Sequence, residues 1–134
     1  NALAAVPDAK LEVISTPTLT VLAGRAVGEQ IRDRPASRRP DGIFCANDLV
    51  AIGVLQALAL MGDVMVPGDI ALVGYDDIEF ARSAVVPLTS IRQPSIEIGS
   101  TAIDLLLKAT ENAGRHPRHV LFQPELVTRL STQA

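Results

Sequence analysis

Short apolar runs alternate along the chain with longer stretches in which apolar residues recur every three or four positions. The apolar runs predict strands at residues 11–15, 42–46, 70–75 and 87–91. The longer stretches predict helices at residues 19–33, 47–61 and 96–113, with a short helix at 78–83 and an extended segment at 120–128. This alternation is typical of βαβ units. We therefore predict an α/β fold with a doubly wound, mostly parallel sheet and flanking helices.

The helix expected at 47–61 is apolar on nearly all sides. From Leu49 to Met61 its only plainly polar residue is Gln56, so it must be covered on more than one side. One side can pack on the sheet, and the other needs a second helix layer within the chain or another subunit. We favour a homodimer, with these candidate interface residues: Leu49, Ile52, Leu60, Phe80 and Val85.

Glycines interrupt the helix expected at 19–33. Gly24 and Gly28 either weaken this helix or let it approach a neighbour closely.

At the amino end of the chain, the pattern of residues 1–6 is typical of the last turns of a helix that begins upstream. We therefore expect the chain to be a fragment of a longer protein.

Composition narrows the class of protein. The chain is 48% hydrophobic but only 3% aromatic, so aliphatic residues must supply the core. Twelve Lys and Arg against fifteen Asp and Glu leave a net charge of −3, so the chain should not bind DNA by itself. A single cysteine, Cys45, favours a cytoplasmic protein over a disulfide-stabilised secreted one. No apolar run reaches the length of a membrane span.

Polar residues follow two of the predicted strands directly. Asn47 and Asp48 follow one strand, and Asp76 and Asp77 follow the next. Open α/β sheets bind ligands at the carboxyl ends of their strands, where such side chains can hydrogen-bond sugar hydroxyls or base edges. The alternative is that these residues only cap the following helices.

Other candidate chemistry is sparse. Phe44 either stacks on a ligand ring or packs in the core. His116 and His119 are too few for a metal site, and no nucleophile or phosphate-binding motif occurs. We therefore expect no catalytic residue, no metal and no cofactor.

Five segments together resemble the lac and galactose repressor (LacI/GalR) family. They are D-G-I-F-C-A-N-D at 41–48 with A-I-G at 51–53, V-P-G-D-I-A-L-V-G-Y-D-D at 66–77, P-L-T-S-I-R-Q-P at 87–94, I-G at 98–99 with Ala102, and L-V-T-R-L-S-T at 126–132. The resemblance covers nearly the whole chain and is strongest from Pro40 to Gly99. Gly68 departs from it, because an acidic residue is common there, and the first 40 residues match only in pattern.

The resemblance implies a periplasmic-binding-protein-like type I core. Residues 1–94 would form its C-terminal effector-binding lobe with the first strand missing, and 95–118 a crossover helix belonging to the N-terminal lobe. Residues 119–134 would be the return strand and C-terminus. The missing strand would lie between residues 11–15 and 42–46, and in the family it carries an effector-binding Arg that has no counterpart here. Outside its own lobe, the apolar face of the crossover helix would need another partner, such as a second copy.

The implied function is effector sensing in a DNA-binding repressor. A sugar or nucleoside-like molecule would contact Asn47, Asp48, Asp76, Phe44 and Gln93, and DNA would be bound only through a helix-turn-helix domain absent from this chain. The alternatives are a periplasmic sugar-binding protein of an uptake system and an enzyme on the same fold. The sequence leaves open the identity of the effector and whether it induces or co-represses.

Overall fold

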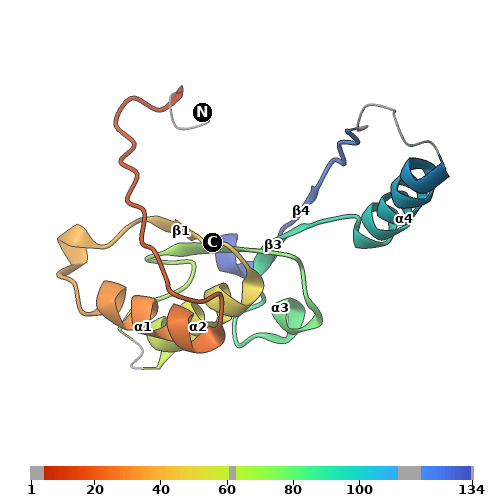
Figure 1. Cartoon of the computed structure of the whole chain (residues 1–134). Coiled ribbons are helices and arrows are strands. Elements are labelled where there is room, and N and C mark those ends of the chain that lie inside the picture. Colours follow the sequence, from red (N-terminus) through yellow and green to blue (C-terminus); the bar gives the residue numbers. More distant parts are fainter. Residues whose placement is uncertain (1–4, 61–62, 112–118, 134) are drawn as a thin grey trace.

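The computed structural model describes residues 5–60, 63–111 and 119–133. In this part of the chain the sheet has the order β1 (Gly42–Phe44), β2 (Ala71–Tyr75), β3 (Thr89–Arg92) and β4 (Glu125–Val127). The first three strands are parallel, and β4 runs antiparallel to β3 (Figure 1). The predicted α/β class with a mostly parallel sheet is confirmed.

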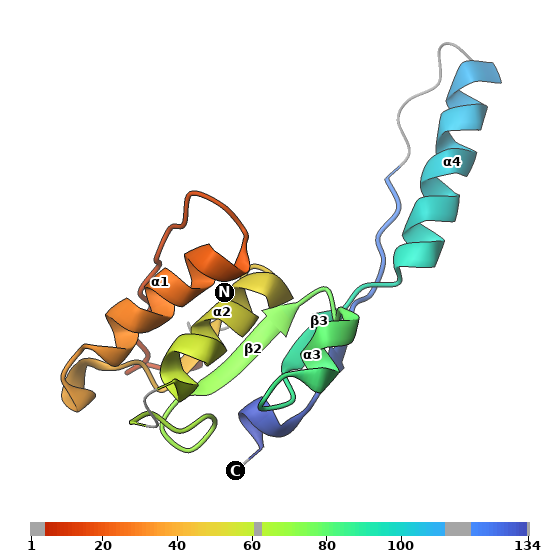
Figure 2. The same cartoon turned by 90° about the horizontal axis from the view of Figure 1, so that it is seen from below.

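Helix α2 (Asp48–Ala59) packs against one face of the sheet, and α1 (Val21–Arg32) packs beside α2 (Figures 1 and 2). The helices begin where side chains cap them: Thr20 Oγ1 accepts from Ala23 N at 3.3 Å, and Asn47 Oδ1 accepts from Val50 N at 2.9 Å. The core forms between α2 and the sheet, and its fully buried members include Val54, Leu55, Leu58, Ile70, Leu72 and Leu88.

Close contact between α1 and α2 depends on glycine. A Cβ added at Gly24 would run into the backbone of Val50, and one at Gly28 would lie 2.7 Å from Ala57 Cβ. A Cβ at Gly53 would meet the backbone of α1 in the same way. The sequence left open whether Gly24 and Gly28 weaken their helix or let it approach a neighbour closely. The structure shows the close approach of α1 to α2.

The remaining elements are two further helices and two 3₁₀ turns. Helix α3 (Glu79–Ser83) is short, and the 3₁₀ turns η2 (Ala36–Arg38) and η3 (Leu130–Thr132) follow α1 and β4. Helix α4 (Ser95–Glu111) leaves the end of β3 and extends away from the sheet, and the chain returns through β4 (Figures 1 and 2).

The strand predicted at residues 11–15 is wrong. This segment is extended but pairs with no strand in the described residues, and Leu11 and Val13 are 73% and 78% exposed. A strand forms only where a neighbour supplies hydrogen bonds, and β1, the edge of the sheet, is not that neighbour. The extended segment expected at 120–128 is a strand only at Glu125–Val127. The last residues of the helices predicted at 47–61 and 96–113 lie outside the described residues, as does His116.

Candidate functional site

β1 and β2 are parallel, so their carboxyl ends lie at the same end of the sheet. Phe44 pairs with Val73 in the parallel register, and Cys45 N donates to Val73 O at 2.8 Å. Asn47 lies three residues after β1, as the N-cap of α2, and Asp76 follows β2 directly, so both lie at the carboxyl ends of adjacent parallel strands.

Asn47 is held by the protein on both sides of its amide. Its Oδ1 caps α2, and its Nδ2 donates to Leu19 O at 3.2 Å, in the loop that leads into α1. The capping role considered from the sequence is thus confirmed for Asn47. One amide hydrogen and one oxygen lone pair stay free of these two contacts.

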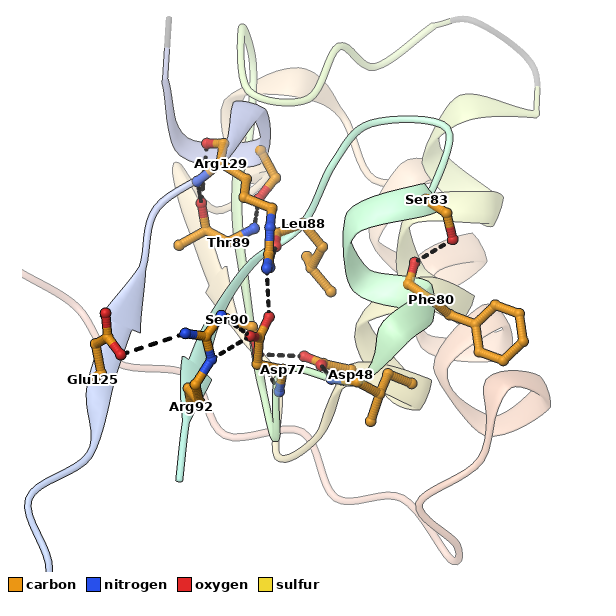
Figure 3. A network of polar contacts seen from close by, with 12 residues as sticks. Asp48, Asp77, Phe80, Ser83, Leu88, Thr89, Ser90, Arg92, Glu125 and Arg129 are labelled. Atoms are coloured by element: carbon orange, nitrogen blue, oxygen red, sulfur yellow. Dashed lines mark hydrogen bonds and ion pairs between the residues drawn. The ribbon is translucent and has the colours of Figure 1, made fainter. Parts of the chain in front are cut away.

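Asp48 is used within the protein. Its side chain is buried at 1% exposure, and its two oxygens accept from Ser90 Oγ at 2.7 Å and Ile78 N at 2.8 Å (Figure 3). Burial raises the pKa of this carboxyl, while both hydrogen bonds oppose the rise. Asp48 connects α2 to β3 and to the start of α3, which leaves it no oxygen facing solvent.

Asp76 and Asp77 point in different directions from consecutive positions. Both have positive φ, 101° and 53°, a conformation that Asp tolerates better than most residues. Asp76 is exposed, and Gln93 Nε2 donates to its Oδ1 at 3.2 Å. Neither caps α3, because its N-cap residue is Ile78 and no side chain bonds there. The interpretation of Asp76 or Asp77 as a helix cap is therefore wrong.

Asp77 lies at the centre of an ionic cluster, which we call the Asp77 cluster: Asp77, Arg92, Arg129 and Glu125 (Figure 3). Its carboxylate contacts Arg92 Nη2 at 2.6 Å and Arg129 Nη2 at 2.7 Å, and its side chain is only 5% exposed. Glu125 contacts the far side of Arg92 at 3.5 Å and is 69% exposed. Burial alone would raise the pKa of Asp77, but the hydrogen bonds from Arg129 and Arg92 hold it below its ordinary value.

Sequence reasoning missed the residues that contact Asp77. Arg92 and Arg129 belong to motifs quoted for the resemblance, but neither was assigned a role. Arg129 also donates to Leu88 O at 2.7 Å, and Ser90 Oγ accepts from Asp77 N at 3.0 Å. The available signal was charge: Arg92 ends β3, Arg129 lies two residues after β4, and a largely buried arginine such as Arg129 needs an acidic partner.

Phe44 and Gln93, the other candidate ligand residues, lie in different surroundings. Phe44 is 64% exposed, on the face of the sheet opposite to Ile43. Gln93 follows β3 directly and contacts Asp76. The described residues contain no group of three or more His, Cys, Asp or Glu arranged to hold a metal ion. In that same part of the chain, none of the helices has the length and apolar character that a bilayer crossing requires.

The candidate dimer residues line two open grooves on the outer side of α2. One groove, of about 310 Å³, is lined by Val21, Leu49, Ile52, Phe80, Ser83 and Ala84. The other, of about 470 Å³, is lined by Arg25, Gln56, Ala59, Leu60 and Val85. Each residue predicted for the interface thus lines one of these grooves.

Comparison with known proteins identifies the family. The sequence profile of the periplasmic binding protein-like domain matches residues 3–132. The chain belongs to this family. Two curated relatives are the ribose operon repressor of Haemophilus influenzae and the PurR repressor of Aliivibrio fischeri MJ11. The first is 39% identical over 71% of this chain and 28% of that protein. The second is 38% identical over 81% of this chain and 32% of that protein.

Solved structures of this family agree with the fold. A LacI-family regulatory protein from Chloroflexus aggregans has a TM-score of 0.79 at 32% identity, over 98% of this chain and 48% of that one. A LacI-family regulator from Lactobacillus casei, solved with bound glucose, has a TM-score of 0.71 at 38% identity, over 84% of this chain and 40% of that one. The LacI/GalR resemblance predicted from the motifs is confirmed, and the chain spans about a third of the length of the curated relatives named here.

Proposed function

We propose that this chain is the C-terminal part of the effector-binding core of a dimeric cytoplasmic repressor. A sugar or nucleoside-like molecule binds between two lobes and biases their relative orientation, and a helix-turn-helix domain outside this chain reads DNA. The observation that carries the proposal is the position of Asn47 and Asp76, which follow the carboxyl ends of two adjacent parallel strands.

The chemistry of this edge suits a polyhydroxyl ligand. Asp76 presents an exposed carboxylate that accepts from ligand hydroxyls, and the amides of Asn47 and Gln93 can both donate and accept. Relatives include repressors of the ribose operon and a regulator with bound glucose, which supports a sugar. The two satisfied oxygens of Asp48 argue that it supports the site without touching the ligand.

Residues 1–94 would form one lobe, and α4 would belong to the other. Helix α4 extends from the sheet with large apolar side chains in water, including Ile96 at 87% exposure together with Ile103, Leu106 and Leu107. Exposed apolar area costs about 25 cal/mol per Å², so this face requires a cover. The second lobe supplies it in this proposal, and residues 119–134 return the chain to the first lobe.

The grooves beside α2 would form the dimer interface. Their linings are mainly aliphatic, with Phe80 as a large exposed anchor of the kind that carries binding energy at interfaces. The function is binding and signal transfer without catalysis, in keeping with relatives that are repressors.

Calorimetry of the intact protein tests the ligand site. We expect a free sugar or nucleoside to bind and the substitution Asp76→Asn to weaken binding roughly 10- to 100-fold, the value of a hydrogen bond to a charged group. Asparagine tolerates the positive φ of this position, so the backbone is preserved. Asp63→Asn is the matched control, because Asp63 is exposed in the loop that precedes β2, at the other end of the strands. Equal affinity in both variants would contradict the proposed site.

A further inference from the structure

The Asp77 cluster joins the point where the chain leaves the sheet for α4 to the segment that follows β4. Arg92 is the last residue of β3, and three residues later α4 begins. Arg129 lies two residues after the end of β4, the strand through which the chain returns. The antiparallel register, with Arg92 opposite Glu125 and Ser90 opposite Val127, places Arg129 beside the start of β3, at the end away from α4. A single buried carboxylate at the tip of β2 therefore contacts the departing connection through Arg92 at 2.6 Å and the segment after β4 through Arg129 at 2.7 Å.

The ligand-facing residues are the immediate neighbours of this cluster. Asp76 precedes Asp77, and Gln93 follows Arg92. The exposed hydrogen bond between Asp76 and Gln93 and the ion pair between Asp77 and Arg92 therefore join the same two backbone segments. The backbone of Asp77 is itself held, because its N–H donates to Ser90 Oγ at 3.0 Å and Ser90 Oγ donates to Asp48 Oδ1 at 2.7 Å. A displacement of Asp76 or Gln93 must therefore move the ion pair between Asp77 and Arg92.

Burial of the Asp77 carboxylate makes its ion pairs with the arginines necessary. A carboxylate at 5% side-chain exposure is strongly destabilised without a charged partner, so Asp77 must stay with the guanidinium groups when the departing connection shifts. Glu125, in contrast, is exposed and 3.5 Å from Arg92, where an ion pair contributes little. Asp77 is therefore the carboxylate of the cluster that can hold the departing connection to the tip of β2.

We propose that Asp77 is a positioning residue that couples ligand occupancy at Asp76 and Gln93 to the orientation of the connection through which the chain enters α4. The inference rests on the proposed function. Ligand contact at Asp76 shifts the tip of β2, and Asp77 transmits the shift through Arg92 to the end of β3, while Arg129 holds the other oxygen of the carboxylate. Removing the charge of Asp77 should leave ligand contacts in place and release this connection from the sheet.

Spin-label distance measurements on the intact protein test the coupling. Labels are placed at exposed Arg38 and Asp104, after substitution of each by cysteine, with buried Cys45 left unmodified. Ribose, glucose, sucrose and adenosine are the probes, and calorimetry gives the affinity of each. In wild type the bound probe should change the distance between the labels. In Asp77→Asn the affinity should stay within about threefold, while the probe-induced change in distance falls by more than half.

Two variants separate coupling from general loss of structure. Glu125→Gln removes the other carboxylate that contacts Arg92 and should keep the full probe-induced change. Arg92→Gln removes one ion pair but leaves Asp77 with Arg129, so it should fold even if Asp77→Asn does not, and its change in distance should again shrink. A full probe-induced change in Asp77→Asn or in Arg92→Gln would overturn the proposal.

Failure of the proposed function would be distinguishable. If no probe binds wild type, the proposed effector role fails for these molecules. The coupling is then tested by comparing the distances between the labels in the unliganded proteins. The distribution of label distances should then be broader in Asp77→Asn than in wild type and Glu125→Gln. Equal widths in the three proteins would show that Asp77 does not hold the departing connection and would overturn the inference.

Discussion

Replacing Gly24 by alanine tests the packing of α1 against α2, which sets the outer face of the lobe. Gly24 is buried on α1, and a Cβ there would collide with the carbonyl group of Val50 and lie 2.8 Å from its Cα. These are backbone atoms of α2, so no side-chain rotation can relieve the overlap. The helices must separate, and the core beneath α2 must follow.

Two opposing terms set the magnitude. Alanine improves the helix propensity of α1 by about 1 kcal/mol relative to glycine. Overpacking a well-packed interior costs about 1–3 kcal/mol and occasionally more, and a rigid backbone obstacle places Gly24 at the upper end. The net loss is therefore about 2 kcal/mol in the free energy of unfolding. With a denaturant slope of about 2 kcal/mol per M, the urea midpoint should fall by roughly 1 M.

The assay is urea denaturation followed by circular dichroism, with Gly99→Ala as the matched control. Gly99 lies in α4, and a Cβ there would meet nothing within 4 Å, so the same substitution should stabilise by about 0.5–1 kcal/mol. The two substitutions should thus shift the midpoint in opposite directions at unchanged slope. A midpoint for Gly24→Ala at or above that of wild type would refute the close-packing argument.

Three further predictions concern charge and assembly. The pKa of Asp48 is raised from 3.8 by burial, so its proton leaves the unfolded chain first, and Asp48→Asn should gain stability relative to wild type as pH rises above that value. The pKa of Asp77 is lowered, so the cost of Asp77→Asn should be full at neutral pH and shrink as pH falls below 3.8; pH-dependent urea denaturation measures both. Phe80→Asp should convert a dimer to monomers in sedimentation velocity, whereas Met65→Asp, equally exposed but outside both grooves, should not.

Elements that depend on local pattern could be predicted from the sequence. The helix predicted at 47–61 is α2, and the strand predicted at 70–75 is β2, because apolar periodicity and the capping Asn47 act within a few residues. The strand predicted at 11–15 failed for the opposite reason. Its residues have the composition of a strand, but a strand also requires a neighbour, and composition carries no information about the neighbour.

The candidate site divides in the same way. Asn47 and Asp76 could be named because each directly follows a strand that the sequence predicts. Neighbouring parallel strands have their carboxyl ends at the same end of the sheet. The partners of Asp77 could not be named, because Arg92 and Arg129 reach it only through the order of β2, β3 and β4. The internal role of Asp48 was hidden for a related reason, since Ser90 lies one strand further across the sheet.

Asp76 and Asp77 are consecutive residues with positive φ, and their side chains serve different purposes. A residue in this conformation costs of order 1–3 kcal/mol and persists only where surrounding contacts over-determine it. For Asp77 those contacts are two ion pairs, and for Asp76 they are the hydrogen bond from its backbone N–H to Ile91 O at 2.9 Å and the side-chain hydrogen bond from Gln93. The backbone bond to β3 and the ion pairs of the next residue therefore sustain the strain at Asp76, which explains how an exposed carboxylate is held in place at the carboxyl ends of the strands before any ligand arrives.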